Sequence, residues 1–338
     1  MQAIIVAGGL GTRLRPLTYT RPKPLIPLLN KPMILHVLDR LPREIEDVIL
    51  PVNYMVDRMR DFFRDNDVGR NVTVIEEKTP LGTGGALKNV ESLIRGRFLA
   101  FNGDVVSSIN ARDLVARHEE YGGVGTIALW EVEDPSAFGA VELRDGNKIS
   151  KFVEKPKPGE APSKLINAGA YVFEREVLKL IPAKKQISME REIFPKLVRR
   201  GLFGQRFEGY WADAGTLKNY IRAMKMVLAS EGTSVNRSVK IADGIKVEKP
   251  VCIGSRCSIA GALGPNVSLG NDCTVEEATV KNSALFDGVS IKKDAMVAGS
   301  IIGEGCRIGS AARVTDTMIG DGVTVAAGHV IGGRQVKT

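Results

Sequence analysis

Between about residues 241 and 333, large aliphatic residues recur every 16 or 17 positions, and this period limits the possible folds more than any other feature of the sequence. Such a repeat predicts a solenoid with three short strands per coil, because each coil can bury its apolar face only against its neighbours. Amphipathic helices would need a period of about 3.6 residues, which is missing inside the repeat. Every member of the three columns is Ile, Val or Leu: Ile253, Leu269, Leu285, Ile302 and Ile319; Ile259, Val275, Ile291, Ile308 and Val325; and Val247, Leu263, Val280, Val297, Val314 and Ile331.

Small residues stand two positions before most members of these columns, and glycine follows many of them. The pattern resembles the hexapeptide-repeat, left-handed parallel β-helix, whose three faces form a triangular prism. All four cysteines lie between 252 and 306, none forms a CxxC pair, and Cys257 and Cys273 are one coil apart in the same inward column. Strands of successive coils lie about 4.8 Å apart, so we interpret these thiols as small core side chains and expect neither a disulfide nor a metal site.

The chain up to about residue 230 alternates strand-like and helix-like segments. This alternation predicts βαβ units and an α/β domain with a mixed, mostly parallel sheet. Strands are expected at 3–7, 47–53, 72–77, 97–103 and 125–132, and helices at 33–41, 86–94, 112–121 and 216–230. The expected organisation is therefore a first domain over 1–230, a linker over 231–240 and the β-helix over 241–338.

The net charge of +8 is spread along the chain rather than gathered in one block, and aromatic residues make up only 6% of it. This combination argues against a stacking platform for nucleic acid and is compatible with a small anionic ligand. No apolar run approaches the roughly 18 residues of a membrane span. The sequence begins directly with a strand and shows no charged or cleavable leader. We therefore expect a cytoplasmic protein with reduced thiols and with neither a nucleic-acid nor a membrane partner.

A glycine-rich loop that carries positive charge follows the first strand. It contains Gly8, Gly9 and Gly11, then Arg13 and Lys23, with prolines that favour an extended, preordered path. The loop lacks the third glycine of a dinucleotide fingerprint and the Gly-Lys pair of a P-loop. Its backbone N–H groups could still form an anion-binding concavity, in which Arg binds phosphate oxygens bidentately and Lys supplies a point charge. A tight turn that served packing alone would not need these cations.

The loop and four later segments resemble sugar-1-phosphate nucleotidylyltransferases, which join a nucleoside triphosphate to a sugar 1-phosphate and release pyrophosphate. The segments follow one another in the order of that family: GGLGTRLRPLTYTRPKPLIPLLNKPM, LGTGGAL (81–87), FNGD (101–104), FVEKP (152–156) with INAGAYVF (166–173), and WADAGT (211–216). Together with the β-helix, the resemblance covers almost the whole chain. It implies that the first domain is a Rossmann-like nucleotidyltransferase domain.

The resemblance also implies a role for each matching residue. Arg13 and Lys23 would be catalytic and would neutralise the triphosphate and the transition state. Asp104 and Asp213 would bind Mg²⁺, the implied cofactor. A lone Asp after a strand has an ordinary structural explanation, but the joint occurrence of these motifs in family order favours the functional one. The residues expected to bind the nucleotide are Gly8, Gly9, Gly11, Thr12 and Gly82, and those expected to bind the sugar phosphate are Gly139, Glu154, Lys155 and Asn167.

Three segments are most similar to mannose-1-phosphate guanylyltransferases: RPKPLIPLLNKPM, LGTGGAL and ISMEREIFPKL (187–197). We therefore predict that the substrates are GTP and mannose 1-phosphate and that the product is GDP-mannose. A glucose-1-phosphate uridylyl-, adenylyl- or thymidylyltransferase is an alternative. A non-catalytic regulatory subunit is a second alternative, although the intact catalytic and metal-binding positions argue against it. An acyltransferase activity of the β-helix is disfavoured, because the repeat holds one histidine, His329, and no long inserted loop.

The β-helix is expected to mediate assembly. Its end coils and flat faces would leave apolar surface and strand edges open, and other copies of the chain could cover them. We therefore predict a homo-oligomer that forms through the β-helix.

Overall fold

The structure of the chain is a computed structural model that describes residues 1–333, 335 and 336. The expected end of the β-helix domain, at 338, lies outside the described residues. By its internal contacts the chain divides into two compact units. The first unit contains Met1–Leu10 and Ile34–Trp211, and the second contains Gly11–Met33 and the chain from Ala212 onward. Most of the glycine-rich loop and the residues that follow it therefore belong to the same unit as the β-helix.

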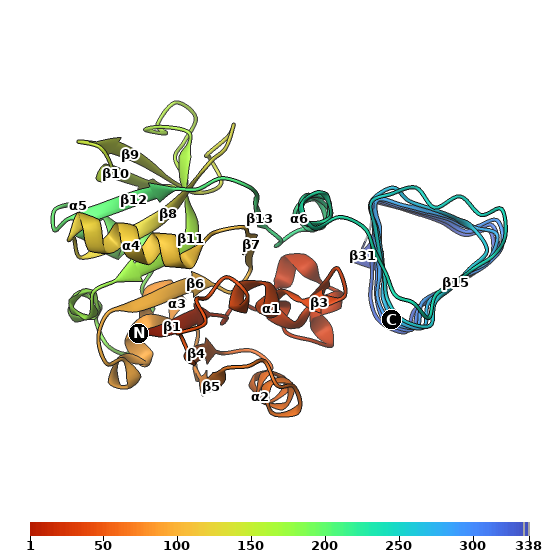
Figure 1. The fold of residues 1–338 in the computed structure, drawn as a ribbon, viewed down its shortest axis with the longest axis horizontal. Coiled ribbons are helices and arrows are strands. Elements are labelled where there is room, and N and C mark those ends of the chain that lie inside the picture. Colours follow the sequence, from red (N-terminus) through yellow and green to blue (C-terminus); the bar gives the residue numbers. More distant parts are fainter. Residues whose placement is uncertain (334, 337–338) are drawn as a thin grey trace. The chain divides into compact units, whose positions relative to one another are not determined.

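A nine-stranded mixed sheet forms the centre of the first unit (Figure 1). The first four strands of its order are parallel to one another, and so are β8 and β12, whereas β11, β10 and β9 pair antiparallel with their neighbours. The mixed sheet confirms the predicted α/β class, with a larger antiparallel share than the alternating pattern indicated. The order across the sheet is β5 (Asn71–Glu76), β4 (Asp47–Val52), β1 (Gln2–Val6), β6 (Phe98–Asn102), β11 (Leu165–Phe173), β8 (Gly125–Glu131), β12 (Leu202–Arg206), β10 (Lys148–Glu154) and β9 (Gly139–Arg144).

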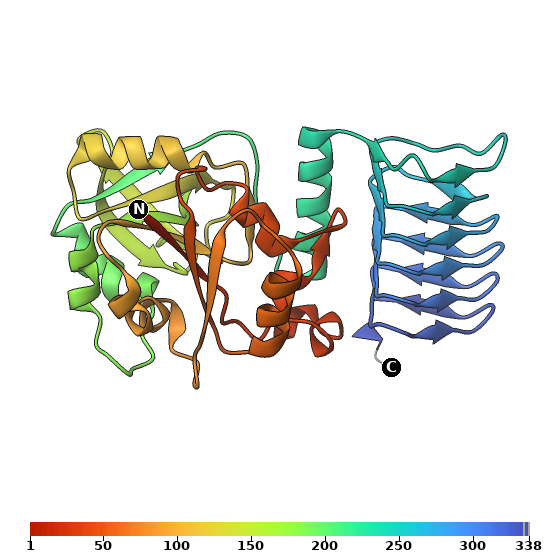
Figure 2. The same cartoon turned by 60° about the horizontal axis from the view of Figure 1, so that its bottom comes forward.

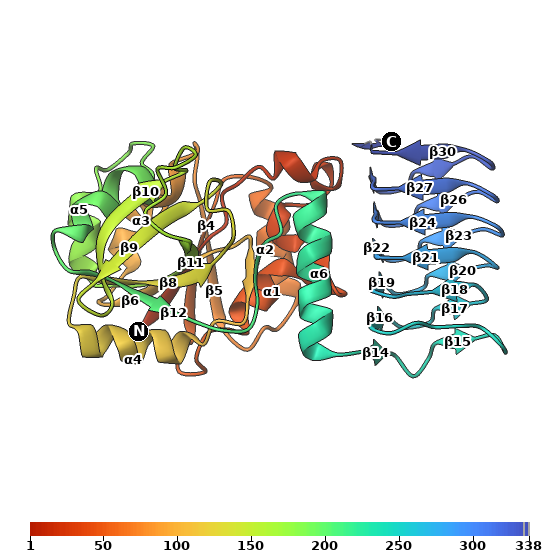
Figure 3. The same ribbon diagram turned by 90° about the horizontal axis from the view of Figure 1, so that it is seen from above.

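Helices cover both faces of this sheet. α4 (Ala111–Tyr121) packs against β8 and β11, whereas α3 (Gly82–Asn89) contacts β1 and α5 (Phe194–Val198) contacts β10. Figures 2 and 3 show α4 on the face opposite α3 and α5. The helix expected over 86–94 begins earlier, ends at Asn89 and is followed by a 3₁₀ turn, Glu91–Leu93. The remaining helices are α1 (Met33–Leu38), α2 (Val56–Asp65) and, in the second unit, α6 (Leu217–Glu231).

Three parallel sheets form the β-helix, one on each side of a triangular coil (Figure 1). In-register pairs such as Ile253 with Leu269, and Leu269 with Leu285, place each predicted column on successive strands of one sheet, which confirms the predicted parallel β-helix. The first sheet contains β14 (Ser234–Val235), β16 (Val251–Ile253), β19 (Val267–Leu269), β22 (Ser283–Leu285), β25 (Ile301–Ile302), β28 (Met318–Ile319) and β31 (Gln335–Val336). The second contains β15 (Lys240–Ile241), β17 (Ser258–Ile259), β20 (Thr274–Val275), β23 (Ser290–Ile291), β26 (Arg307–Ile308) and β29 (Thr324–Val325). The third contains β18 (Ala262–Leu263), β21 (Thr279–Lys281), β24 (Met296–Ala298), β27 (Arg313–Thr315) and β30 (Val330–Gly332).

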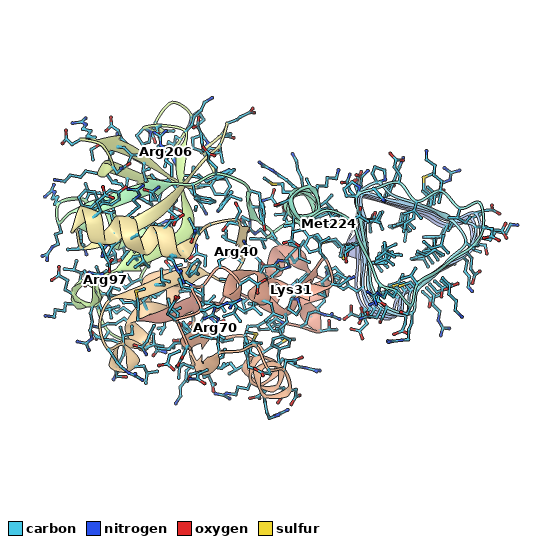
Figure 4. The ribbon with its side chains drawn as sticks, viewed as in Figure 1. Lys31, Arg40, Arg70, Arg97, Arg206 and Met224 are labelled. Atoms are coloured by element: carbon cyan, nitrogen blue, oxygen red, sulfur yellow. The ribbon has the colours of Figure 1, made fainter. Side chains whose placement is uncertain are left out.

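The aliphatic columns and the small residues between them fill the interior of the β-helix (Figure 4). All four cysteines are free, and three of them are buried in this core, as predicted. Each buried thiol also donates to a carbonyl oxygen one coil further along the chain: Cys257 Sγ to Gly270 O at 3.0 Å, Cys273 Sγ to Phe286 O at 3.1 Å and Cys306 Sγ to Gly320 O at 2.9 Å. The thiols therefore fill a narrow space and satisfy a backbone acceptor.

The β-helix begins before the aliphatic columns do. β14 and β15 pair with the strands of the next coil, so the segment expected as a linker, 231–240, already contains one strand and the start of another. Val235 and Ile241 in these strands are 42% and 43% exposed. They have a neighbouring coil on one side only, which explains why the aliphatic pattern fades here.

Residues 11–33, called the 11–33 segment below, consist of three 3₁₀ turns and a hairpin: Thr12–Leu14, Leu17–Tyr19, Lys23–Leu25, β2 (Pro27–Leu28) and β3 (Lys31–Pro32). The extended path expected from the prolines is therefore replaced by tight turns, because the φ angle of proline suits a first helical turn equally well. Tyr220 Oη of α6 donates to Pro27 O and holds the hairpin against that helix. Among the described residues, no helix has the length and apolarity needed to cross a bilayer.

Candidate active site

Two cations converge on one carboxylate in the second unit. Lys23 Nζ lies 3.7 Å from Asp213 Oδ1, and Arg13 Nη2 lies 3.8 Å from Asp213 Oδ2. The side chain of Lys23 is only 7% exposed, whereas that of Arg13 is 61% exposed. The acid is therefore flanked by one buried and one solvent-facing cation, and the formal charges of the three groups sum to a positive value. Such a group can offer an anion two charge-assisted contacts.

Two glycines allow the side chains of Lys23 and Arg13 to lie this close to the Asp213 carboxylate. Gly11 has a φ of +60°, and a Cβ there would lie 3.0 Å from Lys23 Cβ. A Cβ on Gly215 would lie 2.7 Å from both Arg13 Nη2 and Asp213 Oδ1. Gly215 N also donates to Asp213 Oδ1 at 2.9 Å and so fixes the carboxylate. Side chains at these positions would displace the charged groups, which explains the glycine of the WADAGT motif as well as the predicted Gly11.

Gly9 and Thr12, which were also predicted to bind the nucleotide, lie on either side of the boundary between the units. A Cβ on Gly9 would meet no atom within 4 Å, so packing does not require glycine there. Thr12 is the first residue of a 3₁₀ turn. The role of Gly9 and Thr12 in nucleotide binding stays a prediction.

The two predicted metal ligands belong to different units. Asp104 follows β6 in the first unit, and Asp213 is the last residue of β13 (Trp211–Asp213) and belongs to the second. Both side chains are partly buried and have interaction partners. In the part of the chain that the structure describes, no three or more His, Cys, Asp or Glu side chains gather in a way that could hold a metal ion.

A buried acid that the sequence interpretation did not identify, Glu77, directly follows β5. A Cβ on Gly8, which lies just beyond β1, would be 3.0 Å from Glu77 Oε2 and 3.7 Å from Asn53 Cγ. Glu77 is 4% exposed, and burial raises the pKa of its carboxyl to about 7, although a hydrogen bond from the backbone of Leu81 lowers it. Among the described residues, Glu77 Oε1 and Asn53 Oδ1 have no hydrogen-bond partner. Two buried acceptors without donors favour a ligand that brings N–H groups.

The LGTGGAL motif forms the start of α3 and packs against residues 187–190. Gly82 has a φ of +71°, and a Cβ there would lie 2.6 Å from Ile187 O. Gly84 N donates to the same carbonyl oxygen at 2.9 Å, so this N–H group is already used within the protein. Thr83 Oγ1 donates to Glu190 Oε2 at 2.7 Å. The motif is thus held in a fixed conformation next to a second acid that the sequence interpretation did not identify, Glu190.

Three of the four residues expected to bind the sugar phosphate lie on or beside the β9–β10 hairpin. Gly139 and Glu154 are paired across its two strands, and a Cβ on Gly139 would lie 3.0 Å from Glu154 Oε2. Burial raises the pKa of the Glu154 carboxyl, and the negative charge of Glu190 raises it further. Lys155 is exposed and has a φ of 50°, and its backbone N–H donates to Phe138 O at 2.9 Å. The first unit thus brings Gly139, Glu154 and Lys155 together.

Asn167, the fourth of these residues, lies in β11 where the pairing with β8 shifts register. Its Nδ2 donates to Tyr171 Oη at 2.9 Å, and its Oδ1 accepts from Gly169 N at 3.0 Å. Each end of the amide therefore has one partner in the protein and one remaining hydrogen-bonding position. Asn167 can contact a sugar hydroxyl without losing the bonds that orient it.

Comparison with known proteins gives matches over nearly the whole chain. A family model described as nucleotidyl transferase matches residues 2–230, and one described as GMPPB C-terminal domain matches residues 260–337. The probable mannose-1-phosphate guanylyltransferase 3 of Oryza sativa subsp. japonica is 36% identical over 312 residues, which cover 88% of this chain and 84% of that protein. A putative glucose-1-phosphate thymidylyltransferase from Bacillus anthracis, solved in complex with a sucrose, has a TM-score of 0.61 and 27% identity and covers 70% of this chain and 98% of its own. HddC from Yersinia pseudotuberculosis, complexed with GMP-PN, has a TM-score of 0.57 and 28% identity and covers 67% of this chain and 99% of its own.

Proposed function

Because the chain belongs to the nucleotidyl transferase family, as its motifs predicted, we propose that it transfers GMP from GTP to mannose 1-phosphate and yields GDP-mannose and pyrophosphate. The observation that carries the transfer reaction is the convergence of Lys23 and Arg13 on Asp213. The choice of guanine is supported by Glu77, by the name of the rice relative and by the GMP-PN bound to the Yersinia protein.

The reaction joins two anions, so negative charge has to be neutralised before a bond can form. A phosphate oxygen of mannose 1-phosphate attacks the α-phosphorus of GTP. The bond between that phosphorus and the oxygen that bridges it to the β-phosphorus then breaks, and pyrophosphate leaves with the oxygen and the electron pair. The buried Lys23 supplies a fixed positive potential for the triphosphate, and the exposed Arg13 can bind phosphate oxygens bidentately as they enter.

The family generally uses a divalent metal ion, and we propose Mg²⁺ with Asp104 and Asp213 as its protein ligands. Both residues offer the hard carboxylate oxygens that Mg²⁺ prefers. Asp213 is held in place by the N–H of Gly215 before any ligand arrives. Once bound, the ion would neutralise phosphate charge as a Lewis acid. Two protein carboxylates are few, but Mg²⁺ commonly completes its coordination with phosphate and water oxygens.

Glu77 favours guanine over uracil and thymine. Guanine presents two adjacent donors, N1–H and the 2-amino group, which one carboxylate can accept together. Uracil and thymine present a single N–H between two carbonyl oxygens, and a buried carboxylate would repel those oxygens. Glu77 Oε1 and Asn53 Oδ1, both without a partner among the described residues, are acceptors that guanine could satisfy.

A panel of nucleotides and sugar phosphates tests the proposed function. Purified chain should form nucleotide sugar and pyrophosphate fastest from GTP and mannose 1-phosphate in the presence of Mg²⁺. Robust turnover of UTP with glucose 1-phosphate, together with none of GTP with mannose 1-phosphate, would refute the choice of substrates. No turnover with any pair would favour a regulatory subunit.

Replacing Glu77 by Gln is expected to lower kcat/KM for GTP by about 10²-fold, because a buried polar site discriminates strongly against a lost hydrogen bond. The amide presents one acceptor and one donor, so its NH₂ group would face a donor of guanine. Glu76 is the matched control, since it is the adjacent acid and is exposed. Steady-state kinetics of E77Q and E76Q with GTP and UTP measure the effect, and equal GTP kinetics in the two variants would contradict the role of Glu77.

The same carboxyl group predicts a pH dependence of stability. Its pKa is about 7 in the folded chain and close to the ordinary glutamate value in the unfolded chain, so folding favours the protonated form. The stabilisation is complete below the unfolded pKa and is lost as the pH rises through the folded pKa. Between about pH 4.5 and 7.5, the free energy of unfolding should fall by on the order of 1–3 kcal/mol more in the wild type than in E77Q. Urea denaturation across this range measures the difference, and parallel curves would disprove it.

We also propose that copies of the chain assemble through the β-helix. Exposed large apolar residues lie on its first coil and near its end: Val235, Ile241 and Val330 are 42%, 43% and 67% exposed. Burying such side chains between copies would be favourable. Light scattering at micromolar concentration should therefore give the mass of a dimer or a larger assembly rather than a monomer.

The four free thiols suit a reducing compartment, and we propose the cytoplasm.

A further inference from the structure

Within the second unit, a partly buried ion pair joins the 11–33 segment to the β-helix. Arg21 Nη2 donates to Asp321 Oδ2 at 2.6 Å and to Glu304 Oε2 at 2.9 Å, and Thr20 Oγ1 donates to Asp321 Oδ2 at 2.6 Å. The guanidinium group of Arg21 also lies over the ring of Phe286, 5.5 Å from its centroid. The side chains of Arg21 and Asp321 are 18% and 17% exposed, so solvent screens this pair less than an ordinary surface pair.

The β-helix itself fixes the acid of this pair. Asp321 Oδ1 accepts from Glu304 N of the preceding coil at 2.8 Å, which leaves Oδ2 for the 11–33 segment. Asp287 occupies the equivalent position two coils earlier, and its Oδ1 accepts from Asn271 N at 2.8 Å in the same way. No hydrogen bond or ion pair joins Asp287 to the 11–33 segment in the described part of the chain. Asp321 and Asp287 therefore occupy equivalent positions in the β-helix, but in the described chain only Asp321 binds the 11–33 segment.

A second contact holds the tip of the β2–β3 hairpin. Asn30 Nδ2 donates to Leu269 O at 2.6 Å, and Asn30 Oδ1 accepts from Ser268 Oγ at 3.3 Å. Leu29 and Asn30 both have positive φ, 52° and 62°, a conformation that leucine rarely adopts. The bonds to β19 fix this turn, so the 11–33 segment is attached to the first sheet of the β-helix as well as to Asp321. Figure 1 shows β3 and α6 beside that sheet, and Figure 3 shows α6 in the same place.

We propose that the β-helix positions the phosphate-binding cations and that Arg21 is the positioning residue through which it does so. Arg21 lies two residues before Lys23, which begins the 3₁₀ turn Lys23–Leu25, so a shift of Arg21 changes the place of the Lys23 ammonium beside Asp213. The role of these cations in nucleotide binding rests on the proposed function. The β-helix thus has a part in nucleotide binding in addition to assembly.

The test compares Asp321→Ala with Asp287→Ala in the full chain. Both variants lose an equivalent bond to a backbone N–H inside the β-helix, but only Asp321→Ala releases Arg21 and Thr20. Asp321→Ala should raise KM for GTP about tenfold, the loss expected for charge-assisted hydrogen bonds, and should speed amide hydrogen exchange within residues 11–33. Asp287→Ala should change neither quantity. Equal KM and equal exchange of the 11–33 segment in the two variants would overturn the proposal.

Arg21→Lys keeps the test decisive if Asp321→Ala fails to fold. Lysine retains the charge but loses the guanidinium plane that lies over Phe286 and orients Nη2 toward both Asp321 and Glu304, so its KM and exchange rates should lie between those of wild type and Arg21→Ala. Wild-type values in Arg21→Lys and Arg21→Ala alike would contradict the positioning role. The exchange measurement does not depend on the substrate. If the chain does not use GTP, the proposed function is refuted, but faster exchange of the 11–33 segment in the Arg21 variants would still support the positioning role.

Discussion

Replacing Lys23 by Met is expected to lower kcat by about 10²–10³-fold, the loss typical of one fixed electrostatic contact to a transition state. The ammonium group is nearly buried and lies 3.7 Å from Asp213 Oδ1, so its position is set before the nucleotide binds. Methionine keeps an unbranched side chain of similar length and removes the charge. Initial rates of pyrophosphate release at saturating GTP and mannose 1-phosphate measure the effect.

Lys292 provides the control for this substitution. It pairs with Glu276 at 2.6 Å on the exposed surface of the β-helix, so Lys292→Met also removes one lysine from an ion pair. Its kcat should equal that of the wild type. Thermal unfolding of the Lys23 variant should change little, because removing a buried ammonium relieves a desolvation cost while it loses the attraction of Asp213. A Lys23→Met enzyme that unfolds like the wild type and keeps its kcat within twofold would contradict the electrostatic role.

The β-helix was predictable because one physical constraint repeats along it. A residue such as Leu269 is buried by Ile253 on one side and Leu285 on the other, so each coil has to present an aliphatic residue at the same place. The first coil lies outside the predicted limits for the same reason, since Val235 has no preceding coil to cover it. The sequence repeat therefore predicts the interior coils of the β-helix well and its end coils poorly.

The first unit was less predictable because its sheet changes direction. The β9–β10 hairpin does carry a local signal, the Asp145–Gly146 pair, whose positive φ values of 48° and 82° suit the three-residue loop between Arg144 and Lys148. The predicted sheet was mixed but mostly parallel, and without this hairpin its antiparallel share was underestimated. α2 was also missed, since its sequence, VDRMRDFFRD, buries Met59 as its only fully buried residue and its apolar face is short.

The missed acids of the candidate site show a different limit. Glu77 follows a strand, where acids are common, and its sequence neighbourhood does not distinguish it from Glu76. Glu77 becomes a buried acceptor only in the assembled sheet, where it lies close to Gly8 and Asn53, which follow β1 and β4. Glu190 likewise depends on a bond from the distant Thr83. Motif recognition finds residues that a family shares, whereas burial and unsatisfied acceptors appear only once the strands are assembled.

Replacing Asp213 by Asn is expected to reduce turnover by on the order of 10³-fold, which corresponds to the several kcal/mol that a catalytic metal contributes. The amide oxygen can still accept from Gly215 N, so the local fold should persist while the negative charge is lost. Asp272→Asn is the control, because Asp272 accepts two bonds from Arg256 on the exposed surface, each at 2.6 Å. Calorimetric titration with Mg²⁺ in the presence of GTP should show weaker metal binding in the Asp213 variant alone. Unchanged Mg²⁺ affinity would exclude Asp213 as a ligand.

Combining Asp213→Asn with Asp104→Asn tests whether the two acids bind one ion. Residues that act as a unit show strongly non-additive effects, because the first substitution already removes the function that they share. If both aspartates hold the same Mg²⁺, each single variant should lose about as much activity as the double variant. If the two losses multiply instead, Asp104 and Asp213 contribute separately, and Asp213 would then act chiefly by orienting Lys23 and Arg13. The double variant therefore separates a shared metal site from a network of charged side chains.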